Sequence, residues 1–131
     1  MKKEKSSRPK LPVVSEQMKA WSAALEAEVG SWPHASTRSF FGFTALYRKD
    51  KIFAALPRTR GWDTANSIAF KLESPSSAML ARLDQDSRTA SSQGKNGRWF
   101  TFELSTDSDL HDAIDWLGRA YEAAARKKKT S

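Results

Sequence analysis

Basic residues around two predicted turns are the residues whose types and spacing best suit a defined chemistry. Residues 38–60 contain six Lys or Arg and one Asp. A guanidinium group donates a fork of hydrogen bonds that matches phosphate or carboxylate, and an indole ring can stack on a base. The candidate anion- or nucleic-acid-binding residues are Arg48, Lys49, Lys51, Arg58, Arg60 and Trp62. If both turns lie at one end of a sheet, these side chains converge on one ligand.

A purely structural explanation of the same residues stays open. Turns lie on the surface and are commonly charged for that reason alone. Arg58 or Arg60 could also form an ion pair with Asp63 or with an acidic residue of a helix, which would occupy the cation internally.

The net charge of +7 belongs mainly to the two ends of the chain. Residues 1–10 carry a net charge of +4 and residues 126–129 carry another +4, which leaves −1 for residues 11–125. Basic tails support salt-sensitive binding to phosphates without base specificity, and they also keep a protein soluble. The predicted partner is nucleic acid or another polyanion; the alternative is that the tails are only solvated.

No pattern in the sequence indicates catalysis or a metal site. The chain contains no cysteine, which excludes disulfides, thiolate ligands and cysteine nucleophiles. Its two histidines, His34 and His111, have no ligand set or nucleophile near them in the sequence. Gly94 and Gly97 lack the spacing of a phosphate-binding loop. We expect a binding module rather than an enzyme, with no catalytic residue, metal or cofactor.

Alternating apolar residues predict the sheet that positions the basic turns. The predicted strands are residues 43–47, 52–56, 68–72 and 98–104. In the first strand Phe43, Ala45 and Tyr47 share one face, because side chains alternate along a strand. The polar segments 48–51 and 57–66 separate the first three strands, which is typical of antiparallel pairing.

Helical patterns flank these strands. The first apolar stripe is Met18, Trp21, Leu25 and Val29, at spacings of three and four. Ser15 is its predicted N-cap and Gly30 its end. A second, short helix should begin with Ser74 as cap and Pro75 at the first helical position, and the polar segment 84–97 should follow it as a loop.

A last apolar stripe from Leu110 to about residue 126 completes the element order α-β-β-β-α-β-α. The predicted fold class is α+β, an antiparallel sheet of about four strands with helices packed on one face. A length of 131 residues favours a single domain, predicted over 13–126. Residues 1–12 are predicted to be a disordered basic tail, and residues 127–131 a basic C-terminal tail.

Aromatic residues support a second functional hypothesis. Five Trp and seven Phe are many for a chain of this length. Some could line an aromatic cleft between sheet and helices, where a small ligand or a protein partner would bind, although a packed core explains the same residues. No apolar run approaches the roughly 20 residues of a membrane helix, and no apolar segment follows the Lys-rich start, so we expect a soluble, cytoplasmic protein.

Several short motifs lie at places that a known family also marks. They are Phe41-Gly42, Tyr47-Arg48, KIFA at 51–54, IAFKL at 68–72, Trp99 and Tyr121. With the element order, they resemble the MmcQ/YjbR-like proteins and the related TfoX N-terminal domain. The resemblance implies a small α+β domain of double-wing type, for which DNA binding is suspected.

Two longer motifs give a closer resemblance. They are LPRTR at 56–60 and WLGRAYEAA at 116–124. These resemble bacterial proteins of uncharacterised function, some of which carry a luciferase-family label, although no residue here would support light production. The likeness covers about residues 15–125. The segment 57–66, long and rich in Arg with Trp62, departs from the family pattern, so the DNA binding suspected for the relatives need not transfer to this chain.

Overall fold

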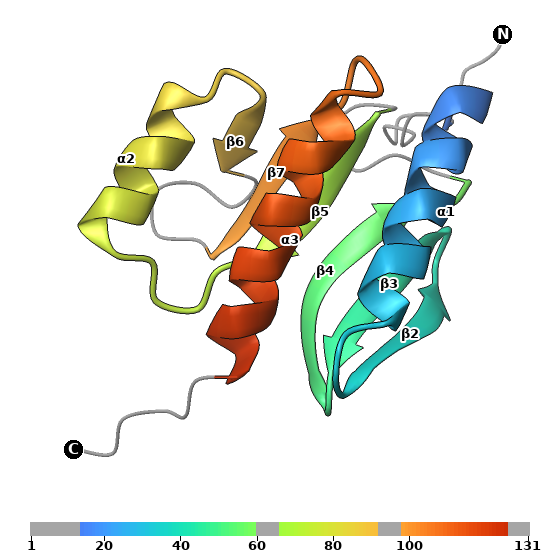
Figure 1. Cartoon of the computed structure of the whole chain (residues 1–131), viewed down its shortest axis with the longest axis horizontal. Helices are drawn as coiled ribbons and strands as arrows, with labels where there is room; N and C mark the ends of the chain where they lie inside the picture. The colour runs from blue at the N-terminus through green and yellow to red at the C-terminus, as the bar shows by residue number, and fades with distance from the viewer. Residues whose placement is uncertain (1–13, 60–65, 92–97, 126–131) are drawn as a thin grey trace, which may run out of the picture.

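Strand pairing joins six segments into one antiparallel sheet within residues 14–59, 66–91 and 98–125, the residues that this computed structural model describes (Figure 1). The strands are β2 (Ala35–Phe40), β3 (Phe43–Arg48), β4 (Lys51–Pro57), β5 (Ser67–Lys71), β6 (Thr89–Ser91) and β7 (Trp99–Glu103). Across the sheet they lie in the order β2-β3-β4-β5-β7-β6. Two-residue turns join β2 to β3 and β3 to β4, so these three strands form consecutive hairpins.

Helices cover one side of this sheet. In the described part of the chain they are α1 (Glu16–Gly30), α2 (Ser77–Gln85) and α3 (Asp109–Ala125). Figure 1 shows α1 and α3 side by side across the strands, with α2 on the other side of α3, next to β6. The element order is therefore α-β-β-β-β-α-β-β-α.

Side-chain caps set where the first two helices begin. Ser15 Oγ accepts a hydrogen bond from the Met18 N–H at 3.0 Å, as predicted for an N-cap. The predicted start of the second helix at Ser74 is wrong: Ser76 is the cap, and its Oγ accepts from the Met79 N–H at 3.1 Å. Serine is a common N-cap residue at either position, but only the Ser76 hydroxyl accepts a hydrogen bond from the N–H three residues later.

The core lies between the helices and the strand faces that point toward them. Leu46 of β3 is fully buried there, whereas Phe43 belongs to a small cluster on the opposite face, so the predicted alternation along this strand is confirmed. The ring of Phe70 in β5 stacks on Trp116 of α3 with 5.4 Å between ring centres. Burying a side chain of this size contributes roughly 1.5–3 kcal/mol, so contacts of this kind hold the helices on the sheet.

A register shift in β4 places one extra aromatic ring in this core. Leu46 pairs with Ala54, but the next residue, Tyr47, pairs with Ile52. Phe53 is the unpaired residue of this bulge, and both Phe53 and Ala54 therefore face the helices. The ring of Phe53 is 1% exposed and lies edge-on to Tyr121 of α3.

The fold class α+β and the antiparallel sheet are confirmed, but the predicted order and the count of about four strands are wrong. The two additional strands are β2 and β6. The side chains of β2 are exposed except that of Ala35, so this strand lacks an apolar alternation and forms through pairing with β3. The three residues of β6 lie inside the predicted loop 84–97 and pair with β7.

Some predictions fall outside the described residues. These are the basic tail 1–12, the tail 127–131, and the parts of the two polar segments at 60–65 and 92–97. Among the helices that the structure does describe, none is both long and apolar enough to cross a membrane.

Candidate anion-binding site

The two basic turns lie at opposite ends of the sheet. Lys49 lies in the turn before β4, Lys51 is the first residue of β4, and Arg58 follows the residue that ends this strand. Seven extended residues span about 20 Å, so these side chains do not converge on one small anion. The condition for a single site is therefore not met. Arg60 and Trp62, the remaining members of the predicted set, lie outside the described residues.

The end of the sheet at the β3–β4 turn gathers more cations than the turn itself supplies. Antiparallel pairing puts the end of β5 and the start of β7 at this same end, because Ala54 pairs with Phe70 and Lys71 pairs with Trp99. We call this surface the basic end; its cations are Arg48, Lys49, Lys51, Lys71 and Arg98. The carboxylates of the same turn and strand ends are Asp50 and Glu73, and Glu122 lies in the last turn of α3 at this end.

The electrostatics of Glu73 show the positive character of the basic end. Lys71 Nζ lies 3.0 Å from a Glu73 oxygen, and Arg98 Nη1 lies 3.4 Å from the other. The hydrogen bond from Lys71 lowers the pKa of Glu73 despite partial burial, which opposes the shift, and the charges of Lys71, Arg98 and Lys51 lower it further. One carboxylate is thus surrounded by three cations, which leaves a positive excess.

A hollow of about 370 Å³ opens at the basic end. It is lined by His34, Arg48, Lys49, Asp50, Lys51, Ala124 and Ala125. His34 and Lys49 both have positive φ angles, 64° and 56°, and the Lys49 N–H donates to the His34 carbonyl oxygen at 2.9 Å. This hydrogen bond joins the loop before β2 to the β3–β4 turn. Left-handed backbone at residues other than glycine is costly and is concentrated at functional sites.

Arg48 contributes its charge to the hollow but has most of its side chain engaged with α3. Its Nη1 donates to the Tyr121 carbonyl oxygen at 3.2 Å, and its guanidinium carbon lies 4.0 Å from the centre of the Tyr121 ring. The carboxyl end of α3 carries a partial negative charge of about half a unit, which Arg48 offsets. Lys49 and Lys51 are therefore the cations best placed to meet a ligand.

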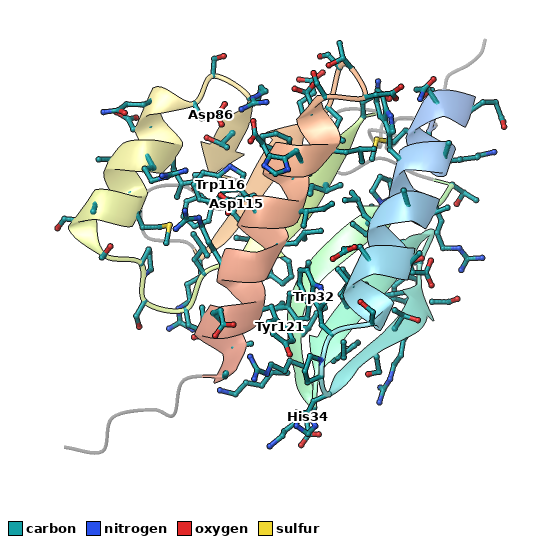
Figure 2. All side chains as sticks on the ribbon, viewed as in Figure 1. Trp32, His34, Asp86, Asp115, Trp116 and Tyr121 are labelled. Atoms are coloured by element: carbon teal, nitrogen blue, oxygen red, sulfur yellow. The ribbon has the colours of Figure 1, made fainter. Side chains whose placement is uncertain are left out.

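Tyr121 fixes the geometry of this end of the molecule. Its hydroxyl donates to the Pro33 carbonyl oxygen at 2.6 Å, and its ring contacts Trp32 edge-on with 5.0 Å between centres. Figure 2 shows Trp32 and Tyr121 together between α3 and the loop before β2, with His34 farther out at the same end. Tyr121 is only 7% exposed and does not line the hollow; it packs beneath the residues that do.

Arg58, at the other end of β4, is held on the β2–β3 hairpin. Its Nη1 donates to Ser39 Oγ at 2.6 Å, and its backbone N–H donates to the Gly42 carbonyl oxygen at 2.9 Å. The Thr59 N–H donates to the same oxygen at 3.0 Å. The hydroxyl of Ser39 is neutral, so this contact orients the guanidinium without cancelling its charge.

Arg88 forms a charge cluster that the sequence did not indicate. Its guanidinium donates to Asp86 at 2.9 and 3.0 Å, to Asp109 at 2.8 Å and to Asp112 at 3.0 Å. The guanidinium carbon lies 4.6 Å from the centre of the Phe102 ring. The hydrogen bonds to Asp86 and then to Asp112 and Asp109 raise the pKa of Arg88 above its usual value, against the effect of burial.

This cluster is structural, because its one cation is saturated by internal partners. The pKa of Asp86 is lowered first by the hydrogen bond from Arg88, and that of Asp109 first by the N–H of Ser105 at 2.6 Å. Asp109 thereby binds the two N–H groups of Ser105 and Thr106, just before α3, while it also binds Arg88, so the cluster ties the segment before β6 to the start of α3. The sequence feature that could have indicated this cluster is the repeated Asp at the start of α3. The cation that these residues bind, Arg88, lies 21 residues before Asp109 in the chain.

The two histidines are far apart. His111 lies in the first turn of α3. His34, in the loop before β2, lines the same hollow as Ala124, which is in the last turn of α3. At about 1.5 Å of rise per residue, the helix separates them by roughly 20 Å. Within the described ranges no group of three or more His, Asp or Glu side chains could hold a metal ion.

The aromatic side chains between sheet and helices are packed against one another. Phe53, Phe70 and Phe102 are less than 2% exposed, and Trp116 and Tyr121 of α3 cover the first two. A hollow of about 540 Å³ lies instead between α2 and the β6–β7 edge. Its lining includes the apolar residues Leu80, Leu83 and Phe100. An aromatic cleft that binds a ligand stays a prediction, with this edge as its nearest equivalent.

No family model, no curated protein and no solved structure matches this chain. The likeness of residues 15–125 to the MmcQ/YjbR-like proteins therefore stays a prediction, and so does the double-wing assignment.

Proposed function

We propose that this protein is a non-enzymatic module that binds nucleic acid or another polyanion, with the basic end as its folded contact. The observation that supports this most is the concentration of five cations against two carboxylates in the β3–β4 turn and at the adjoining ends of β5 and β7. Residues 11–125 together carry a net charge of −1, so this concentration is local and is not a consequence of overall charge. A surface of this kind attracts phosphates by electrostatics and releases their counterions.

Lys49 and Lys51 are the contacts that the proposal places first. Both side chains are exposed, and no ion pair between described residues engages either of them. Lys71 and Arg98 both pair with Glu73, and Arg48 binds Tyr121. These three therefore contribute to the positive electrostatic potential more than to direct contacts with a ligand. The helix that lines the hollow ends at Ala125, and the sequence continues with Arg126 and three lysines.

The test is fluorescence anisotropy with labelled single-stranded and double-stranded oligonucleotides of equal length, from low to physiological salt. The test variant is Lys49→Asn with Lys51→Gln. Asn tolerates the positive φ of residue 49, so the turn should keep its shape. The matched control is Lys19→Gln with Arg82→Gln, which removes two exposed cations from α1 and α2.

Loss of two phosphate contacts should weaken binding on the order of tenfold and lower the slope of log affinity against log salt by about 1.4 for a single strand. The control pair should leave the slope nearly unchanged. An equal loss of affinity in both double variants would mean that binding depends only on the net charge of the protein. Absence of binding near physiological salt would remove nucleic acid as the partner.

The second candidate function is binding of a small ligand or a protein at an apolar surface, and the hollow between α2 and the β6–β7 edge favours it. Leu80, which lines this hollow, is 45% exposed. Binding at such a surface depends little on salt. The same titration therefore separates the two functions.

A further inference from the structure

The tip of the β2–β3 hairpin exposes two aromatic rings. Phe40 is 47% exposed and Phe41 is 85% exposed, and their ring centres lie 4.9 Å apart in an edge-on arrangement. We call Phe40, Phe41 and Gly42 the hairpin tip. Single exposed apolar residues are common on surfaces, but two adjacent rings at a turn form a patch that is usual for a binding contact.

The backbone of the hairpin tip does not favour phenylalanine. Phe40 pairs with Phe43, so Phe41 and Gly42 form a two-residue turn, with φ angles of 46° and 87°. Such turns favour Asn-Gly, because both residues need positive φ, and a bulky side chain is strained there. The ring at position 41 is neither buried nor required by the turn, so stability of the fold does not explain it.

Arg58 is the cation beside the hairpin tip, and the hairpin and β4 contain no carboxylate near it in the sequence. The Arg58 backbone N–H donates to the Gly42 carbonyl oxygen, and the hydrogen bond from Nη1 to Ser39 Oγ holds the guanidinium beside the tip. Arg38, on the same hairpin, lies 4.9 Å above the ring of Tyr47, on the side away from the tip. Neither residues 35–48 nor residues 51–59 contain an acidic residue.

One other feature of this end complements a polyanionic strand. The Val14 N–H donates to the Thr59 carbonyl oxygen at 3.3 Å, so the chain that follows the basic residues 1–10 joins the fold beside Arg58. The proposed function names nucleic acid as the partner, and an unpaired base offers the flat face on which an exposed ring stacks.

We propose that the hairpin tip is a stacking contact for an unpaired nucleobase, with Arg58 on the adjacent phosphate, so that the protein prefers single strands to duplex. Every base has a face that can stack on an aromatic ring, so this contact is tolerant of sequence. A duplex hides these faces inside its base stack. The proposal rests on the proposed function, because it specifies which form of nucleic acid is bound and adds a contact about 20 Å from the basic end.

The experiment uses the full chain and three labelled probes of equal length: a thymidine strand, a strand of abasic residues with the same phosphates, and a duplex. The main variant is Phe41→Asn, which removes the ring and suits the positive φ of this turn position. Its thermal midpoint should equal or exceed that of the unchanged protein, so misfolding would not explain a loss of binding. Phe41→Trp restores a ring, and Arg58→Gln removes the flanking cation.

The unchanged protein should bind the thymidine strand more tightly than the abasic strand. Phe41→Asn should weaken binding to the thymidine strand on the order of tenfold and leave binding to the abasic strand unchanged. Phe41→Trp should keep the preference. Arg58→Gln should weaken binding to both strands, because both carry phosphate.

Equal affinity for the thymidine and abasic strands would overturn the stacking contact and leave the proposed function intact. Absence of binding to all three probes would overturn both. Vesicles of phosphatidylcholine with phosphatidylserine provide a further arm. If Phe41→Asn abolishes vesicle binding and does not change oligonucleotide binding, the hairpin tip is a membrane contact, and the proposal is wrong.

Discussion

Arg48 and Tyr121 contact each other in two ways: the guanidinium carbon lies 4.0 Å from the centre of the Tyr121 ring, and Nη1 donates to the Tyr121 carbonyl oxygen at 3.2 Å. The pair joins the end of β3 to the last turns of α3. A residue that the sequence marked as an anion contact therefore also holds the fold together at the basic end. The two roles can be separated, because the charge and the planar fork are lost by different substitutions.

Arg48→Met should lower the free energy of unfolding by about 1–2 kcal/mol, through loss of the stacked guanidinium and its hydrogen bond to the carbonyl. Arg48→Lys should lower it less and should keep most of the affinity for oligonucleotides, because the charge remains. Urea denaturation measures the first effect and anisotropy the second. An unchanged urea midpoint for Arg48→Met would show that the contact with Tyr121 does not stabilise the fold.

Tyr121→Phe should destabilise the protein by about 1 kcal/mol, because it removes the donor to the Pro33 carbonyl oxygen at 2.6 Å and leaves the ring contacts in place. Tyr47→Phe is the matched control on the half-buried second tyrosine, and it should change stability by less than about 0.5 kcal/mol. Thermal or urea unfolding distinguishes them. Equal effects at both positions would exclude a specific role for the Tyr121 hydroxyl.

Arg88→Met should destabilise the protein by about 2–3 kcal/mol near neutral pH, because it leaves Asp86, Asp109 and Asp112 close together without their cation. Arg119→Met removes a half-buried cation of α3 that pairs with one carboxylate, Asp115, and also contacts Met79 and the Trp116 ring; it should cost about 1 kcal/mol or less. The urea midpoints of the two variants measure this difference in stability. Similar costs would mean that the Arg88 cluster behaves as ordinary surface ion pairs.

Acid should destabilise the protein through the same cluster. The pKa values of Asp86 and Asp109 are lowered in the folded state, so the unfolded chain binds more protons around pH 4, and stability rises with pH there. The contribution is complete above about pH 5 and is lost as pH falls through the unfolded and then the folded pKa.

The pH series should be run on the unchanged protein and on Arg88→Met, with urea midpoints from about pH 7 to about pH 3. Without the Arg88 charge, the folded-state pKa values of these carboxyls should rise, and the loss of stability on acidification should become shallower. Parallel curves for the two proteins would show that other groups, such as Glu73, whose pKa is also lowered, dominate the acid response.

The sequence by itself determined the elements whose side chains follow a local period. The alternation of Phe43, Ala45 and Tyr47 defined β3, and the stripe behind Ser15 defined α1, because burial of one face requires that spacing. These features also determined the α+β class. The four-strand count failed at β2 and β6, which have no apolar alternation and exist because a neighbouring strand offers backbone partners.

Only the tertiary structure decided which charges meet. Arg48, Lys49 and Lys51 are neighbours in the chain, but Lys71 and Arg98 join them through antiparallel pairing, and the length of β4 separates Arg58 from all five. Likewise, Arg88 finds its partners on a helix that begins 21 residues later. Sequence spacing fixes which residues share a face of one element, whereas distances between elements depend on long-range pairing and packing, which no local pattern encodes.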